Sequence, residues 1–224
     1  MLRKASARAQ TLSSILAAFS LSSTPLTAQD KYWKNQATIG AGLAVPGGDT
    51  SAYMSSSFLL RLNYAYRFHK NLQAEVGLDS ILGGAGVNKV APTPFGNVRV
   101  YDCEYFYPFG ARVILPLFHN RFEFSGGGGG AYMQYSEEIK PAEDSAATCP
   151  YGGCGCVTCK LRAGWGYYSV AGAAFSLDHR RRFWLGVNGR YVRGTTSGQS
   201  LGTGPDSATK DRWLGTTVDF TYRF

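Results

Sequence analysis

Apolar and polar residues alternate at every second position in six segments of the chain, a spacing that is typical of β-strands with one apolar face. In residues 58–68 (FLLRLNYAYRF), one face is wholly apolar and the other is largely polar. The six segments are residues 36–45, 58–68, 72–79, 104–115, 183–191 and 213–224. Two more segments, residues 121–135 and 165–177, read as strands but are so rich in glycine and alanine that their facing stays open. The pattern predicts an all-β chain with eight strands.

The connections between these segments alternate between short and long. Tight polar turns are expected at residues 69–71, 119–120 and 178–182. Long polar or Gly/Pro-rich loops are expected at residues 46–55, 83–102, 136–163 and 194–212. Short turns on one side and long loops on the other are typical of up-and-down β-barrels that cross the bacterial outer membrane. This asymmetry decides between the two architectures that so much β-structure allows, a soluble sandwich and a lipid-facing barrel.

A closed barrel leaves no unpaired backbone edge in hydrocarbon, so its apolar faces must meet lipid and its polar faces must line the lumen. The charged residues that this facing places in the lumen are Arg61, Arg67, Glu75, Asp79, Arg112, Glu123, Arg190, Asp219 and Arg223. Eight strands enclose a lumen that side chains can fill. With five cations and four acids at these positions, we expect an ion-paired, packed interior.

Composition narrows the class of protein further. Aromatic residues make up 14% of the chain and charged residues only 17%, and there are 28 glycines, values that fit a lipid-facing barrel. The formal net charge is +8, but no cluster of Lys and Arg is interleaved with aromatics on a recognisable module, so no nucleic-acid partner is expected.

The N-terminus has the features of a secretory signal. Arg3, Lys4 and Arg8 precede a ten-residue apolar stretch, residues 12–21, and an Ala closes the segment at position 28. Such a stretch is too short to cross a bilayer as a helix. We expect a signal peptide at residues 1–28 and a single barrel domain at residues 29–224.

The last seven residues, VDFTYRF, alternate to the final position, with Val218, Phe220, Tyr222 and Phe224 on one face. This pattern resembles the C-terminal signal that the outer-membrane barrel assembly machinery reads. Together with the strand count and the export signal, it makes the chain similar to the small eight-stranded outer-membrane barrels of the OmpX, OmpW and OmpA transmembrane-domain type. The resemblance implies a multi-pass β-barrel in the bacterial outer membrane, surrounded by lipid. Unlike in full OmpA, we expect no periplasmic domain after Phe224.

The resemblance implies three classes of function: structural or surface-recognition proteins, narrow pores or transporters for small or hydrophobic molecules, and lipid A-modifying enzymes. The enzymes of this kind place a catalytic His near the extracellular half of the barrel. Here His69, His119 and His179 all lie in the predicted short turns, so we expect no catalytic residues and no enzyme. No metal and no cofactor are expected either. A structural role, or recognition of a surface ligand through the loops, is the leading hypothesis, and a narrow pore or transporter is the alternative.

The loop at residues 136–163 is rich in cysteine. Cys149, Cys154, Cys156 and Cys159 fall within eleven residues, and Cys103 precedes them in the chain. Only Cys156 and Cys159 have the C-x2-C spacing of a zinc knuckle, and CVTCK is a single weak match to a variant haem-attachment motif. Disulfides are the default outside the cytoplasm. We therefore expect two disulfide bonds and one remaining thiol. Titration of free thiols in denatured, unreduced protein tests this, and a count of four or five free thiols would contradict it.

Overall fold

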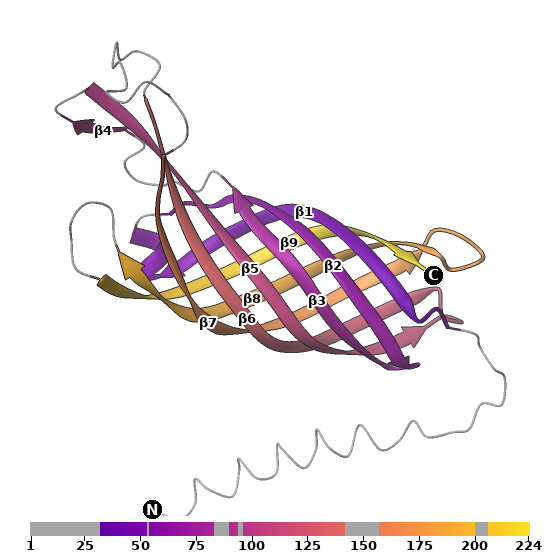
Figure 1. The fold of residues 1–224 in the computed structure, drawn as a ribbon. Helices are drawn as coiled ribbons and strands as arrows, with labels where there is room; N and C mark the ends of the chain where they lie inside the picture. The colour runs from indigo at the N-terminus through magenta and orange to yellow at the C-terminus, as the bar shows by residue number, and fades with distance from the viewer. Residues whose placement is uncertain (1–31, 53, 83–89, 94–95, 142–156, 200–205) are drawn as a thin grey trace, which may run out of the picture. The chain divides into compact units, whose positions relative to one another are not determined.

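The computed structural model describes residues 32–52, 54–82, 90–93, 96–141, 157–199 and 206–224. Residues Trp33–Phe224 form one compact unit, drawn in colour in Figure 1. The signal peptide predicted at residues 1–28 lies outside the described residues. Within the described part of the chain, no helix is long and apolar enough to cross a membrane.

Eight antiparallel strands close into a barrel (Figure 1). They are β1 (Asn35–Gly48), β2 (Ser57–His69), β3 (Leu72–Leu82), β5 (Gly96–Leu117), β6 (Phe122–Pro141), β7 (Val157–Ser176), β8 (Phe183–Gln199) and β9 (Asp206–Arg223). Neighbours along the chain pair with one another, β3 pairs with β5, and β9 pairs back to β1. The predicted all-β, eight-stranded up-and-down barrel is therefore confirmed. The sequence pattern missed a short strand, β4 (Val90–Thr93), which pairs with β5, and a 3-10 turn, η2 (Asp49–Ala52).

The two ends of the barrel differ as predicted. The turn end carries the tight connections after β2, β5 and β7, and β9 meets β1 there through a pair of backbone hydrogen bonds between Asn35 and Phe224. One of these turns holds Phe118, His119 and Asn120 with φ between 49° and 61°, the left-handed conformation that reverses a chain within few residues. The opposite end, called the loop end below, carries the longer connections.

The outer wall of the barrel exposes a continuous set of large apolar side chains. The exposed set includes Ile39, Leu43, Leu62, Val76, Phe109, Leu115, Phe124, Val187, Val218 and Phe220. A soluble protein does not leave this much apolar surface in water, whereas a barrel in hydrocarbon requires it. Aromatic pairs gather at both margins of the belt, such as Phe183 with Tyr222 at the turn end (5.2 Å between centroids) and Tyr132 with Trp165 toward the loop end (5.1 Å). The wall is therefore built to sit in a bilayer.

The strands on one side of the barrel are much longer than those on the other. β3 has 11 residues, whereas β5 has 22 and β6 and β7 have 20 each. The β3–β5 ladder ends at the pair Ile81 and Glu104, and the β7–β8 ladder begins at Ala163. Beyond those points β5, β6 and β7 continue past their neighbours, with β4 added to β5 (Figure 1). We call this extension the protruding ribbon: β4 with residues 96–103, 137–141 and 157–162.

Much of what was predicted as loop is therefore strand. The expected loops at residues 83–102, 136–163 and 194–212 each contain strand at one or both ends. The reason is physical: beyond the hydrocarbon layer the outward face no longer has to be apolar, so the alternation disappears while the backbone pairing continues.

The glycine run Gly126–Gly130 lies within β6 and makes room for bulky neighbours. Gly130 pairs with Phe109, whose ring lies 2.5 Å from the place where a Cβ would stand, so the bare backbone is covered by an aromatic ring on the lipid side. On the lumen side Gly110 has the same effect, because the hydroxyl oxygen of Tyr168 lies 2.6 Å from the position of its missing Cβ. Tyr168 can thereby reach across the lumen.

Candidate functional site in the barrel lumen

All nine charged residues predicted for the lumen lie inside the barrel and are buried. The two-residue period of the strands places them there: Arg61 and Arg67 come from β2, Glu75 and Asp79 from β3, and the others from β5, β6, β8 and β9. They form two groups at different heights. We call Arg61, Glu75, Asp79, Arg112, Arg190 and Asp219 the central cluster, and Arg67, Glu123 and Arg223 the turn-end triad.

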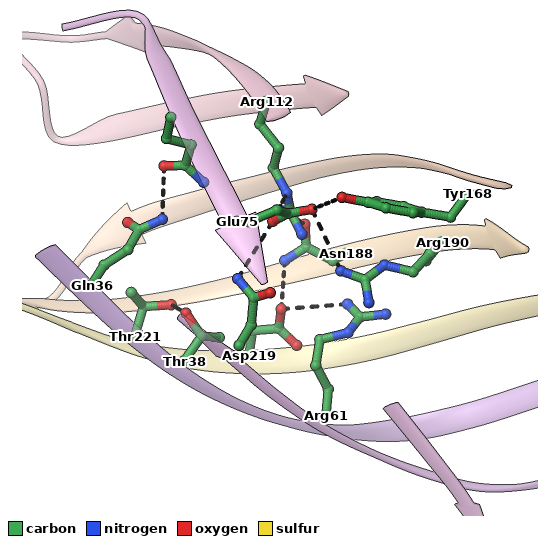
Figure 2. Close-up of polar contacts among 12 residues, drawn as sticks. Gln36, Thr38, Arg61, Glu75, Arg112, Tyr168, Asn188, Arg190, Asp219 and Thr221 are labelled. Atoms are coloured by element: carbon green, nitrogen blue, oxygen red, sulfur yellow. Dashed lines mark hydrogen bonds and ion pairs between the residues drawn. The ribbon is translucent and has the colours of Figure 1, made fainter. Parts of the chain in front are cut away.

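Glu75 is the hub of the central cluster (Figure 2). Its carboxylate lies 2.5 Å from Nε of Arg112 and 3.7 Å from Nη2 of Arg190. It also accepts a 2.7 Å hydrogen bond from the hydroxyl of Tyr168. Tyr168 stands on β7, across the lumen from β3, so one carboxylate ties together four strands of the wall.

A second chain of contacts completes the central cluster. Asp79 accepts hydrogen bonds from Arg61 at 3.1 Å and from Arg190 at 2.5 Å. Arg61 also lies 3.6 Å from Asp219, which accepts a 2.7 Å bond from the amide of Asn188. Three arginines therefore share three carboxylates, and the charges of the central cluster balance.

The turn-end triad is built differently, because its two arginines share one carboxylate. Glu123 receives both guanidinium groups, with Arg67 at 3.1 Å and Arg223 at 2.6 Å for the shorter contact of each. Arg223 also stacks on the ring of Trp184, 3.9 Å from its centroid. These contacts link β2, β6, β8 and β9 across the end of the lumen.

A cavity of about 50 Å³ lies between the central cluster and the turn-end triad. Its polar lining includes Arg61, Arg112, Asn188 and Asp219 on one side and Glu123 and Arg223 on the other. A space of this size holds only a few water molecules.

A layer of apolar side chains fills the lumen on the loop-end side of the central cluster, which corrects the prediction of a polar interior throughout. This apolar plug consists of Leu59, Ile81, Phe106, Met133, Val192 and Trp213, all buried. Phe106 and Trp213 meet edge to face at 6.5 Å. The void beneath the plug measures only about 10 Å³, so the packing approaches that of a protein core.

Solved structures share this architecture. The chain is similar to Neisserial surface protein A (NspA), with 11% identity, 85% of this chain and 97% of that chain covered, and a TM-score of 0.51. It is similar to the outer membrane protein OprG from Pseudomonas aeruginosa, with 15% identity, coverage of 86% and 97%, and a TM-score of 0.50. The protein therefore has the eight-stranded barrel fold of these outer-membrane proteins. No protein-family model matches the sequence, and comparison with curated proteins finds no match.

Among the described residues, the sequence pattern missed three buried ionic residues of this barrel. Glu104 lies beside the apolar plug and accepts a 2.6 Å bond from the indole of Trp213. Asp211 accepts bonds from Thr50 at 2.8 Å and Thr196 at 2.5 Å. The third is Arg162 of β7. Asp211 fell in a predicted loop, and Glu104 is the first residue of its predicted segment, so alternation alone singled out neither.

Arg162 is the arginine of this set, and it also fell in a predicted loop. Its guanidinium lies 4.2 Å above the ring of Tyr135, inside the mouth of the barrel at the loop end. The two-residue period of β7 could have revealed it. Arg162 lies six residues before Tyr168 in β7, so both side chains fall on the same, inward face of the strand.

Two of the five cysteines, Cys103 and Cys159, lie in described strands of the protruding ribbon. Cys103 is half-buried in β5, has no disulfide partner among the described residues, and pairs in register with Ser136. The backbone of Cys159 pairs with Glu137 in the β6–β7 ladder. Cys149, Cys154 and Cys156 lie outside the described residues, as does the side chain of Cys159, so the two disulfides stay a prediction. Among the described residues no group of three or more His, Cys, Asp or Glu is placed to hold a metal ion.

Three residues of the resembled assembly signal lie on the outer face of β9, and the fourth, Phe224, follows its last residue. Val218, Phe220 and Phe224 are exposed, and Tyr222 stacks between Phe183 and Phe224 at the turn end. The turn end of the last strand therefore presents aromatic side chains on its outer face, toward lipid. Its backbone pairs with β8 over residues 206–222 and with β1 over residues 211–223.

Proposed function

We propose that the protein is a non-conducting outer-membrane barrel that displays the protruding ribbon and the Cys-rich loop at residues 136–163 for recognition of a surface ligand. One observation carries this proposal: the lumen is obstructed at three successive heights, by the turn-end triad, the central cluster and the apolar plug. An ion crossing it would have to displace paired charges and then enter an apolar core, and both steps are costly.

The display role is supported by the asymmetry of the wall. Strands β5 to β7 continue past their neighbours on one side, and such an extension serves no purpose in spanning lipid, for which about 9 to 11 residues per strand suffice. Two disulfides in the adjoining Cys-rich loop would restrict its conformations and favour a rigid recognition surface.

The alternative is a narrow pore or a transporter for small or hydrophobic molecules. The glycine run in β6 favours this alternative at the level of sequence, because bare backbone widens a barrel locally. In the structure, however, Phe109 covers Gly130 and Tyr168 fills the space over Gly110. The alternative therefore has less support than a sealed barrel.

We propose no enzymatic activity. The three histidines lie at the turn end, His69 as the last residue of β2 and His119 and His179 in short turns. His69 accepts a hydrogen bond from the Asn71 backbone, and His179 contacts Arg121 at 3.0 Å. A base at the turn end is on the side of the membrane away from lipid A. We also propose no cofactor.

The test of the sealed lumen is single-channel conductance of refolded protein in a planar bilayer, with and without reductant. We expect no channel openings in either condition, because the three obstructions lie inside the lumen and do not depend on the cysteines. Heat-modifiable migration on a gel verifies that the silent protein is folded. Steady openings without reductant would favour the narrow pore, and openings only after reduction would make the Cys-rich loop a gate.

We also propose that β9 carries the signal for the barrel assembly machinery. Replacing Phe224 with Ala is expected to slow insertion by assembly machinery reconstituted in vesicles several-fold, and to leave spontaneous refolding in detergent nearly unchanged. The matched control is Phe118→Ala, an exposed aromatic in a turn at the same end of the barrel. Equal slowing of both variants in the assembly reaction would contradict a role for the C-terminal residue.

A further inference from the structure

The part of the lumen between the apolar plug and the turn end carries one more positive than negative charge among its described residues. Its described buried ionic residues are five arginines and four carboxylates, the members of the central cluster and the turn-end triad. The ionic residues beyond the apolar plug, such as Glu104, are separated from this part by the plug. A net charge in a closed interior is costly unless a counter-ion neutralises it.

The surplus charge can be located. In the central cluster Arg61, Arg112 and Arg190 each have a carboxylate within 3.1 Å, and the three carboxylates Glu75, Asp79 and Asp219 are all used. In the turn-end triad, by contrast, Arg67 and Arg223 share Glu123 alone. The excess of one positive charge therefore belongs to the triad.

Buried donors without a partner occur on both sides of the cavity. Nε of Arg223 and Nη2 of Arg61 have no hydrogen-bond partner among the described residues, and both side chains are more than nine-tenths buried and line the cavity. Nε of Arg67 is also buried and unpartnered. Unsatisfied guanidinium donors in a polar cavity require an acceptor.

We propose that this cavity binds one small monovalent anion of the chloride class. Such an ion supplies the missing negative charge and accepts from the free donors of Arg61 and Arg223. Accompanying water donates to Oδ1 of Asp219 and Oδ1 of Asn63, two acceptors on the same lining that have no partner among the described residues. A volume of about 50 Å³ admits an ion of roughly water size with a few waters, whereas a larger oxyanion would not fit and a divalent one would overcompensate the charge.

The direct test is crystallography of the full barrel in sodium bromide, since the anomalous signal of bromide distinguishes the ion from water. We expect an anomalous peak in the cavity between Arg61 and Arg223. Density for water with no anomalous peak would overturn the proposal. A peak confined to the outer surface of the barrel would also overturn it, because it would indicate an adventitious ion only.

Two variants test the role of the surplus charge. Arg67→Gln removes the excess positive charge and leaves the residues that line the cavity unchanged. We expect it to weaken bromide binding by about tenfold or more, because charges attract strongly across a medium of low dielectric. Glu123→Gln has the opposite sign and is expected to retain or strengthen binding. Arg193→Gln, on the exposed outer face of β8, is the control and should bind as the unmodified protein does.

Stability provides a readout that does not depend on crystals. At equal ionic strength, chloride should raise the urea midpoint of the barrel in lipid vesicles relative to gluconate, an organic anion too large for the cavity. The difference should be lost in Arg67→Gln and kept in Arg193→Gln. A chloride effect of the same size in all variants, or none in the unmodified protein, would contradict the site.

Discussion

Replacing Glu75 with Gln is expected to lower the free energy of unfolding by about 3–5 kcal/mol, one of the two largest effects of a single substitution in this barrel. The change preserves the shape of the side chain but removes its charge. Arg112 then has no carboxylate partner, and Arg190 retains only Asp79. A guanidinium left buried without its counter-charge accounts for most of the cost.

The measurement is reversible urea unfolding in lipid vesicles, followed by tryptophan fluorescence. The matched control is Asp49→Asn, the same acid-to-amide change on an exposed residue that accepts a bond from the Lys210 backbone; a loss of at most about 1 kcal/mol is expected there. The double variant Glu75→Gln/Arg112→Gln should recover part of the loss, because it removes the unpaired cation as well. Equal effects of Glu75→Gln and Asp49→Asn would show that the central cluster does not stabilise the fold.

The sequence was most informative where lipid constrains it. In β2 the outward residues must be apolar and the inward ones are free to be polar, so residues 58–68 reveal both the strand and its facing. The same argument placed Arg61 and Asp79 in the lumen, where they turn out to be direct neighbours in the β2–β3 register. Register across strands that are far apart in sequence cannot be read in this way, so the contact between Glu75 and Tyr168 was not foreseen.

The sequence was least informative outside the bilayer. At the loop end of β8 and β9 the outward residues are polar in both strands, so no alternation of apolar and polar residues distinguishes strand from loop. These residues are Arg193 and Thr195 in β8 and Lys210 and Arg212 in β9. Asp211 lies between two of these residues and points inward, and was therefore overlooked. The fold could be predicted because closure in lipid imposes it, whereas the extent of the protruding ribbon could not.

The apolar plug escaped prediction for a different reason. The alternation places Leu59 on the inward face of β2. Because Arg61, Asn63 and Arg67 on the same face are polar, the pattern predicts a polar face over the whole strand. The lumen-facing residues change character along the barrel axis, from ionic near the turn end to apolar at the plug, with the ionic residues Glu104, Asp211 and Arg162 on the loop-end side. Position along each strand decides which kind of side chain the interior receives, and an average over the strand hides it.

The second large effect is expected at Trp213, the largest side chain of the plug. Replacing it with Ala should lower the free energy of unfolding by about 3–5 kcal/mol, because a buried aromatic leaves a cavity that its surroundings fill only in part. The substitution also removes the indole that donates to Glu104 at 2.6 Å, so a buried carboxylate loses its hydrogen bond. The measurement is loss of the heat-modifiable band and of β-sheet circular dichroism with rising urea.

Two variants separate the causes. Trp213→Phe keeps an aromatic ring and removes the donor, and is expected to cost about 1–3 kcal/mol, the penalty of leaving a buried polar group unpaired. Trp165→Ala is the control, since Trp165 is 65% exposed on the outer face of β7 and its removal leaves no internal cavity. If Trp213→Ala were no more damaging than Trp165→Ala, the apolar plug would not be the packed core that seals the barrel, and the case for a non-conducting protein would rest on the ion pairs alone.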